Sequence, residues 1–332
     1  MPRIAITIVT HNSAATIDAC LGAVMGQDYG DFTVIAVDNA SCDDSRQHLG
    51  AWEGPKLRVV ANDRNTYFAR AHNWAIDHTD SEFVLTLNPD VMLYPDYLSH
   101  VVTAFDRSPH IGSVNGKLLL LDRESMVAEA LLSPPESSVL IDGAGLTMRR
   151  SRRPYLRGNR QLARTHCLQP RYIFGVDAAC GAYRRAMLDD VVLDGEYFDN
   201  DFLIYREDVD LAWRAQLYGW DSYYTPDAVA YHVRGFHLGR GRREMATELK
   251  RHSVKNGWLL PLKNDSPRSM ARCLPWILPY QIKILGGILA VERQSLGAVS
   301  DAITLVPTMR RKRRIIQERR RRTERDMRKW FV

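Results

Sequence analysis

Over residues 4–87 the chain alternates short apolar runs with amphipathic segments, and this order restricts the fold more than any other feature. Ile4–Thr10 is almost unbroken in its apolar character, which is typical of a strand covered on both faces of a parallel sheet. Apolar residues of Ile17–Met25 then recur at the spacing of one helix face. Further strands are expected at 32–37, 57–60 and 83–87, and a second helix at 68–76. This order predicts an α/β, doubly wound, mostly parallel sheet with flanking helices.

Polar residues follow three of the expected strands, at 10–12, 38–39 and 88–90. Ligands of doubly wound sheets bind at the carboxyl ends of the strands, so these residues are expected to face one crevice. Asn, Asp and Pro also end strands for backbone reasons, so any one group could be a turn and nothing more. The prediction of a site depends on all three groups meeting.

Residues 106–170 show no regular pattern, and we expect an irregular excursion there instead of a core element. Strand-like patterning resumes at 172–176 and after Cys180. Farther on, Glu207, Asp208 and Asp210 place three acids within four residues, at the start of an expected helix. These acids could do no more than interact favourably with the helix dipole. Carboxylates crowded among apolar residues also suit a general base or a bound cation.

At this point the chain resembles the family 2 inverting glycosyltransferases of the GT-A fold, in particular the rhamnosyltransferase-like branch that builds bacterial surface polysaccharides. The resemblance covers about residues 3–260 and depends on the order and spacing of short motifs. It implies a GT-A catalytic domain over 1–235. After Gly235 the pattern changes to helices, so we expect 236–332 to be a helical, membrane-surface-associating region with a basic tail. The motifs are Val9-Thr10-His11-Asn12, Val37-Asp38-Asn39, Asn65-x-x-Phe68-Ala69-x-Ala71-x-Asn73, Leu87-Asn88-Pro89-Asp90, Gly181-Ala182, Phe198-Asp199, Tyr205-x-Glu207-Asp208-Val209-Asp210-Leu211-x-x-Arg214 and Gly219-Trp220.

The resemblance implies a nucleoside-diphosphate sugar as the donor, with Asp38 bonded to the base. Asp90 would bind Mg²⁺ or Mn²⁺, and Asn88 replaces the first acid of the family's D-x-D motif, which suggests weaker metal binding. His232 matches a histidine that binds the metal in some relatives, or it is a packed residue at the end of a strand. The implied nucleotide-sugar-binding residues are Thr10, His11, Asn12, Asp38, Asn65, Asn73, Asn88 and Asp90.

Asp208 would be the general base that deprotonates the acceptor hydroxyl, and a single base implies inversion at the anomeric carbon. The implied acceptor is a lipid-linked or polysaccharide glycan, with rhamnose the first donor sugar to test and another hexose or galactofuranose the alternative. The arginines of 149–157 would meet an acceptor diphosphate or form a solvated loop. Tyr67 and Ala75 stand where the family usually has glycine. The acceptor-positioning residues would be Glu207, Asp210, Gly181 and Ala182.

The net charge of +6 is unevenly distributed. Residues 310–329 contain twelve Lys or Arg and three acids, a net of +9, whereas the rest of the chain carries −3. This basic tail could bind an anionic membrane, bind nucleic acid or be only solvated. Trp330 and Phe331 resemble interfacial anchors, so the membrane is favoured and nucleic acid is not. Residues 274–291 are short for a spanning helix and include Lys283, so we expect a monotopic or packed helix.

Five widely spaced cysteines without a C-x-x-C pair indicate a reduced protein, and the N-terminus lacks the pattern of a signal peptide. We therefore expect a cytoplasmic enzyme, peripheral on the inner face of the plasma membrane, and homo-oligomerisation stays open. Two other classes stay open. A sugar-1-phosphate nucleotidyltransferase should carry a Gly-rich phosphate loop after the first strand, where this chain has 10–14. A non-catalytic nucleic-acid-binding protein would use the basic tail.

Overall fold

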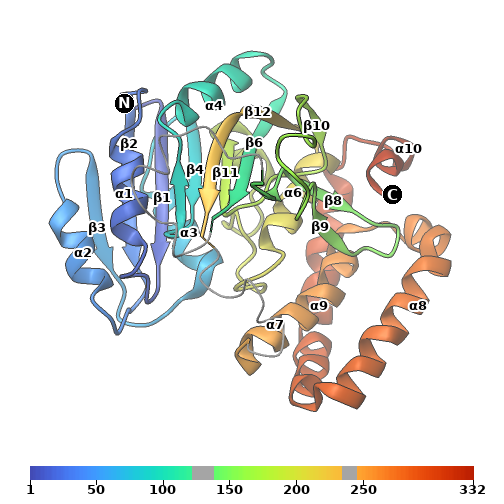
Figure 1. The fold of residues 1–332 in the computed structure, drawn as a ribbon. Coiled ribbons are helices and arrows are strands. Elements are labelled where there is room, and N and C mark those ends of the chain that lie inside the picture. The colour runs from blue at the N-terminus through green and yellow to red at the C-terminus, as the bar shows by residue number, and fades with distance from the viewer. Residues whose placement is uncertain (122–137, 234–244) are drawn as a thin grey trace.

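The computed structural model describes residues 1–121, 138–233 and 245–332. Its N-terminal part alternates strands and helices around one large sheet (Figure 1). The predicted strands and helices of this part are confirmed to within a residue or two at each end. The elements are β1 (Ile4–Thr10), α1 (Ile17–Met25), β2 (Phe32–Asp38), α2 (Ser45–Trp52), β3 (Leu57–Ala61), α3 (Tyr67–Asp77) and β4 (Phe83–Leu87).

The sheet is mixed, with strand order β10-β12-β6-β11-β4-β1-β2-β3. Strands β1 to β4 are parallel, whereas β11 runs antiparallel between β4 and β6. The mostly parallel α/β architecture is therefore confirmed. The remaining elements before the C-terminal helices are β5 (Val91–Leu93), α4 (Tyr97–Asp106), β6 (Ile111–Leu120), β7 (Ile141–Gly143), β8 (Leu146–Met148), β9 (Pro154–Leu156), β10 (Arg171–Ile173), β11 (Cys180–Arg184), α5 (Arg185–Val191), α6 (Glu207–Leu217) and β12 (Asp221–His232).

Helices cover both faces of the parallel part of the sheet. Val34 and Ala36 of β2 pack into the same core cluster as the apolar face of α1. Ile35 and Val37 pack on the other side, where α3 supplies buried Ala71 and Ala75. Alternate residues of one strand thus pack under different helices, as the two-residue period of a strand requires.

The expectation of an irregular segment over 106–170 is wrong for the described residues. Strand β6 is almost entirely buried and pairs with β11, β12 and β7. Its apolar pattern is interrupted by Asn115, which is buried and accepts a hydrogen bond from the Asp177 amide at 2.8 Å. Strands β8 and β9 form a hairpin, and Arg152 at its tip is buried against Asp265 at 2.7 Å. This arginine is therefore neither solvated nor available to a substrate.

The C-terminal part is helical, and the expected boundary between 235 and 236 falls in 234–244, outside the described residues. Helices α7 (Thr247–Asn264) and α9 (Gly297–Glu318) lie side by side, while α8 (Pro267–Val291) stands apart from the sheet (Figure 1). A 3₁₀ helix at Arg293–Leu296 connects α8 to α9, and α9 is followed by α10 (Glu324–Met327) and a 3₁₀ turn at Arg328–Trp330.

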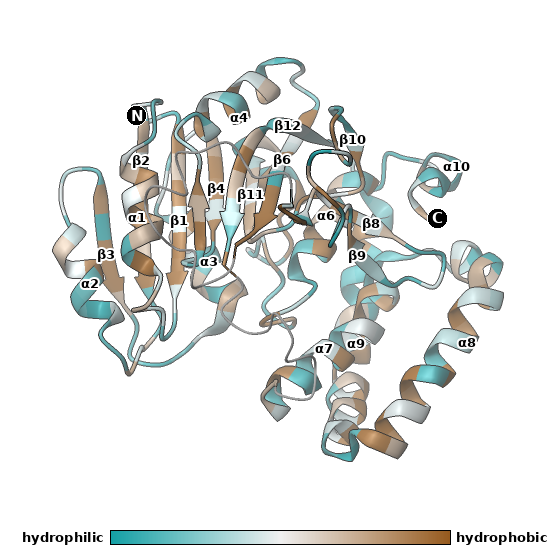
Figure 2. Cartoon of the chain, in the orientation of Figure 1, coloured by the Kyte–Doolittle hydropathy of each residue, from teal (hydrophilic) through white to brown (hydrophobic). Residues whose placement is uncertain are grey.

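Helix α8 is longer than the sequence pattern suggested. By its length of 25 residues and its apolar composition, it is the one described helix able to cross a membrane. Only 6% of its most apolar stretch is buried. Figure 2 shows hydrophobic residues distributed along its whole length. Leu274, Ile282 and Leu289 are each more than half exposed. A largely packed helix is thus excluded, and the alternative of a helix at a membrane surface stays a prediction.

The interpretation of 310–329 as a separate basic tail is wrong. Several of its cations pair with acids of the sheet domain: Arg311 with Asp194, Lys312 with Asp199 and Asp201, Arg321 with Asp190, and Arg322 with Asp221. Trp330 and Phe331 are not exposed anchors either. Phe331 is 8% exposed and packs against Trp213, with the Arg152 guanidinium 3.9 Å from its ring centroid. The tail therefore packs against the sheet domain, which it was expected to hold at a membrane.

A buried set of charges connects this closing segment to the sheet domain, and we call it the ion cluster: Asp199, Asp210, Arg214, Lys263 and Lys312. The Lys263 ammonium lies 2.7 Å from Asp199 and 2.6 Å from Asp210. Lys312 lies 2.7 Å from the other Asp199 oxygen, and Arg214 lies 3.0 Å from Asp210. Burial alone would raise the pKa of Asp199, but the two ammonium groups outweigh it and hold this pKa well below its ordinary value.

Removing one cation from the ion cluster should destabilise the whole chain. In Lys312→Met a buried carboxylate loses one of its two counter-charges, and the free energy of unfolding should fall by about 3 kcal/mol. The matched control is Arg314→Met, an exposed cation of the same helix without an ion pair to any described residue, which should change it by less than about 0.5 kcal/mol. Urea denaturation measures both, and equal losses would contradict this account.

Candidate active site

The three polar groups expected at the strand ends do meet in one pocket. This sheet-edge pocket has a volume of about 470 Å³ and opens at the carboxyl ends of β1, β2 and β4. Ile204 and Leu249 reach it from elsewhere in the chain. The predicted residues that line it are Thr10, His11, Asn12, Asn65, Asn88 and Asp90, joined by Asn39 and Pro89.

Hydrogen bonds fix the wall of this pocket. The Asn39 amide nitrogen donates to Asn65 at 2.9 Å, and its oxygen accepts from the Thr66 amide at 2.9 Å. The His11 ring bonds the Asn39 carbonyl at 3.0 Å. Asp38 is 3% exposed and accepts a hydrogen bond from the Thr10 hydroxyl at 3.2 Å, so it lies behind the wall.

Tyr67, at one of the usual glycine positions, has a left-handed backbone with φ of 62°. An L-residue rarely adopts this conformation, which explains why glycine suits the position. Its ring lines the pocket and its hydroxyl bonds Glu248 of α7. Ala75, at the other such position, is fully buried beneath the sheet and does not reach the pocket. The departure at Tyr67 therefore reshapes the pocket, whereas the one at Ala75 does not.

Besides Asp38, His232 and the three acids of α6, three predicted site residues do not line the pocket: Asn73, Gly181 and Ala182. Asn73 is 6% exposed, donates to the Phe198 carbonyl at 2.7 Å and accepts from the Phe198 amide at 2.9 Å, so it positions the segment before α6. Gly181 and Ala182 are buried in the middle of the sheet on β11. A Cβ at Gly181 would lie 2.8 Å from the Tyr183 hydroxyl. Direct contact of these three residues with a substrate is therefore not supported.

Asp90 and His232 come together at one side of the pocket. The His232 Nε2 atom lies 3.3 Å from Asp90 Oδ1, and its Nδ1 atom lies 2.8 Å from Asp142 Oδ2. Burial would lower the pKa of His232, but bonds to the two carboxylates outweigh it and raise this pKa to about 10. Asp142 holds the ring so that Nε2 faces Asp90, as carboxylates behind metal-binding histidines do. Among the described residues no three His, Cys, Asp or Glu side chains could hold a metal ion by themselves.

The acids at the start of α6 separate into two environments. Glu207 is 6% exposed, and burial followed by the charge of Asp208 raises its pKa well above the ordinary value. Asp208 is only partly buried, and burial followed by the nearby charge of Asp177 raises its pKa to about 7. Asp210 belongs to the ion cluster and is fully buried, so it is not placed to position an acceptor. Asp208 is thus the acid that could exchange a proton with a ligand at neutral pH.

The backbone before α6 is held in an unusual conformation. Leu203, Tyr205 and Arg206 all have positive φ angles, between 62° and 70°, although none is glycine. The Asn256 amide of α7 donates to the carbonyls of Phe202, Ile204 and Tyr205 at 2.8 to 2.9 Å. Strained conformations of this kind persist only where the surroundings fix them, and they gather at functional sites. Helix α7 therefore positions the entry to the acid cluster.

Sequence reasoning missed Asp177, Asn256 and Lys263, which act on the site from other elements. Asp177 follows the expected strand at 172–176 directly, so its place at a strand end was a usable signal. Lys263 lies 2.6 Å from Asp210. Its partner Asp210 is 53 residues away, and spacing alone gives no sign of that contact.

Residues 5–117 match the family described as Glycosyl transferase family 2. Over these residues, about a third of the chain, the sequence is similar to a family 2 glycosyltransferase domain. This match covers β1 to β4 and most of β6, and so it includes every strand that ends at the sheet-edge pocket. This match confirms the predicted resemblance to the family 2 glycosyltransferases.

A solved structure with the same fold as this family 2 domain is the mannosyltransferase PcManGT from Pyrobaculum calidifontis, in complex with GDP-Man and Mn²⁺. It gives a TM-score of 0.53 and 19% identity, and the match covers 96% of this chain and 86% of that one. The predicted GT-A fold is confirmed by this likeness.

Among curated relatives, the N-acetylglucosaminyl-diphospho-decaprenol L-rhamnosyltransferase of Mycobacterium tuberculosis is 25% identical over 251 residues, covering 71% of this chain and 77% of that protein. An uncharacterised protein of Sinorhizobium fredii, y4gI, is 28% identical over 245 residues, which is 70% of this chain. The chain spans 24% of that protein's length, and 64% and 39% of two further relatives.

The carboxyl group of Asp208 should titrate near neutrality. In protein labelled with ¹³C at the aspartate carboxyl carbons, the signal missing from Asp208→Asn should have a midpoint near pH 7. Asp177→Asn removes a neighbouring negative charge and should lower that midpoint, whereas Asp96→Asn, at an exposed aspartate, should leave it unchanged. A midpoint near the ordinary value of about 4 in the unaltered protein would contradict this environment.

Proposed function

We propose that this protein is an inverting glycosyltransferase, which transfers a sugar from a nucleoside diphosphate to a hydroxyl of a glycan acceptor. The observation that carries the proposal is the arrangement of two sites along one segment. The sheet-edge pocket includes Ile204, and Asp208, the acid with a pKa near 7, follows four residues later. The family 2 match over the strands that form this pocket supports the same function.

Asp208 acts as the general base in this proposal. With a pKa of about 7, its carboxylate is substantially deprotonated at neutral pH and still basic enough to accept a proton from a hydroxyl. As the acceptor oxygen forms its bond to the anomeric carbon, that carbon's bond to the diphosphate oxygen breaks and the hydroxyl proton passes to Asp208. A single displacement leaves the anomeric carbon inverted.

A divalent cation, Mg²⁺ or Mn²⁺, fits the pair formed by Asp90 and His232. An oxygen of Asp90, which lines the sheet-edge pocket, lies 3.3 Å from an imidazole nitrogen of the buried His232, and Asp142 fixes the ring. Two protein ligands leave the other coordination positions to donor phosphate oxygens and water. Bound there, the cation would supply charge neutralisation for the departing nucleoside diphosphate. Because the cation must displace the Nε2 proton of His232, its binding should strengthen as pH rises.

The sugar and acceptor follow from the relatives. We propose rhamnose as the first donor sugar to test, and a lipid-linked glycan as the acceptor, because the Mycobacterium tuberculosis relative is named for both. A position on the inner face of the plasma membrane fits the exposed apolar side chains of α8. The anionic-membrane contact expected through 274–332 is accordingly assigned to α8, because many cations of 310–329 are engaged with the sheet domain.

The experiment compares Asp208→Asn with the unaltered protein and with Asp227→Asn, an exposed aspartate of β12. A thermal-shift panel of nucleoside-diphosphate sugars with and without Mn²⁺ identifies the donor, and transfer is then measured to N-acetylglucosaminyl-diphospho-polyprenol. Asp208→Asn should lower kcat by a factor of about 10²–10⁴ while donor stabilisation survives. Asp227→Asn should leave both unchanged. Near-normal turnover in Asp208→Asn, or no stabilisation by any donor, would overturn the proposed function.

A further inference from the structure

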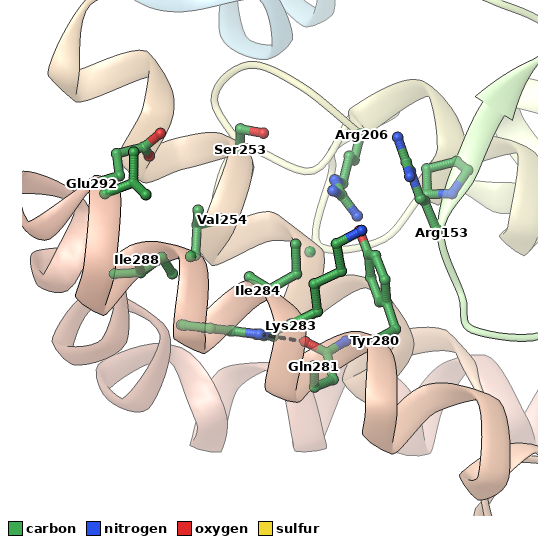
Figure 3. Close-up of a pocket in the computed structure, with 15 residues that line it drawn as sticks. Arg153, Arg206, Ser253, Val254, Tyr280, Gln281, Lys283, Ile284, Ile288 and Glu292 are labelled. Atoms are coloured by element: carbon green, nitrogen blue, oxygen red, sulfur yellow. Dashed lines mark hydrogen bonds between the residues drawn. The ribbon is translucent and has the colours of Figure 1, made fainter. Parts of the chain in front are cut away.

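A second pocket lies among the C-terminal helices. This helix pocket has a volume of about 590 Å³. It is lined by the β8–β9 hairpin, by Arg206 directly before α6, and by helices α7 and α8 (Figure 3). One end of it is cationic and the rest is mainly apolar. The residues that matter to its chemistry are Arg153, Arg206, Trp258, Tyr280, Lys283 and Ile284.

The cationic end forms no ion pair in the described part of the chain, although the charge of Asp208 acts on Arg206 from a longer distance. No described carboxylate lies within ion-pair distance of Arg153, Arg206 or Lys283. In Figure 3 the side chains of Lys283 and Tyr280 point toward Arg206, and Arg153 lies beside them. Glu292, the one acid in the lining, is at the opposite end and accepts a hydrogen bond from Ser295 at 2.5 Å. Three convergent cations of this kind suit a phosphate or diphosphate, which arginine binds with paired donors.

Both the helix pocket and the exterior of α8 present apolar side chains. Trp258, Ile284 and Ile288 line its interior. On a different face of α8, exposed apolar residues recur three or four positions apart and so form one stripe. The stripe consists of Leu274, Leu278, Ile282, Leu285 and Leu289. A molecule with an anionic head and a long apolar tail would place its head at the cations and its tail along this helix.

The position of Arg206 connects this pocket to the proposed chemistry. Ile204 lines the sheet-edge pocket and Arg206 lines the helix pocket, so the strained segment separates the two. Arg206 is also the residue at the N-terminus of α6, directly before Glu207 and Asp208. Gly257 of α7 leaves room for its guanidinium, which would lie 3.2 Å from a Cβ at that position. A sugar attached to a head group at Arg206 would therefore lie toward Asp208.

We propose that the helix pocket binds the diphosphate of a polyprenyl-linked acceptor through Arg153, Arg206 and Lys283, with the polyprenyl chain following α8 into the membrane. This inference rests on the proposed function and adds the site that selects the acceptor. It distinguishes such a lipid from a free glycan, which has no diphosphate for the three cations to bind.

Isothermal titration calorimetry in EDTA tests the site on the full chain, because without a divalent cation the Asp90–His232 pair cannot hold a diphosphate. The probes are farnesyl diphosphate, inorganic pyrophosphate and farnesol. Farnesyl diphosphate should bind at least tenfold more tightly than either of the other two. Equal affinity for pyrophosphate would overturn the lipid assignment, and equal affinity for farnesol would overturn the anion site.

Lys283→Gln and Arg206→Gln should each weaken farnesyl diphosphate binding at least tenfold. Lys283 is exposed, so its substitution should not disturb folding. Arg272→Gln is the matched control, an exposed cation of α8 outside the pocket, and it should bind like the unaltered protein. Unchanged binding in Lys283→Gln and Arg206→Gln would overturn the proposal. Donor stabilisation in the thermal-shift panel reports on the proposed function separately, because the donor pocket contains neither cation.

Discussion

The pairing of Lys263 and Lys312 with the buried carboxylates of Asp199 and Asp210 is the interaction on which the rest of the structure depends. Unpaired carboxylates at such depth would cost several kcal/mol each in lost hydration, so the sheet domain needs these cations as much as the C-terminal helices need the acids. One lysine comes from α7 and the other from α9. The sheet domain and the C-terminal helices therefore form one unit, in which the helices complete the site.

The same helices determine what lies on either side of the acid cluster. Asn256 of α7 holds the strained backbone at 203–206, which has the sheet-edge pocket on one side and the helix pocket on the other. A nucleotide sugar in the first pocket and a phosphorylated lipid in the second would meet near Asp208. The apolar stripe of α8 would then lie against the membrane while the sheet domain faces the solvent. In this account α8, which we propose to face the membrane, and Asp208, the proposed general base, belong to one structural unit.

Much of the fold could be predicted from the sequence, because a strand buried on both faces and an amphipathic helix each leave a local pattern. Strands β1 to β4 and the convergence of Thr10, Asn39 and Asp90 follow from that pattern and from the rule for strand ends. Strand β6 was missed because its buried polar residues, Asn115 among them, have partners in distant segments of the chain. Local pattern carries no information about such partners.

The basic tail was misread for a related reason. Twelve cations in a short segment look like a surface for an external anion, but Lys312 and Arg321 find their acids more than 100 residues earlier in the chain. Asn73 and Asp210 were likewise placed at the substrate because their motifs fit the family, whereas their buried contacts give them structural roles. Motif spacing identified the right region, and burial decided which of its residues can touch a ligand.

A crystal structure of the full chain with Mn²⁺ and the nucleoside-diphosphate sugar that stabilises it tests the central claim most directly. The account predicts the diphosphate in the sheet-edge pocket, Mn²⁺ bound to Asp90 and His232, and the anomeric carbon on the side that faces Asp208. Mn²⁺ bound away from Asp90, or a donor whose anomeric carbon is turned away from Asp208, would contradict it.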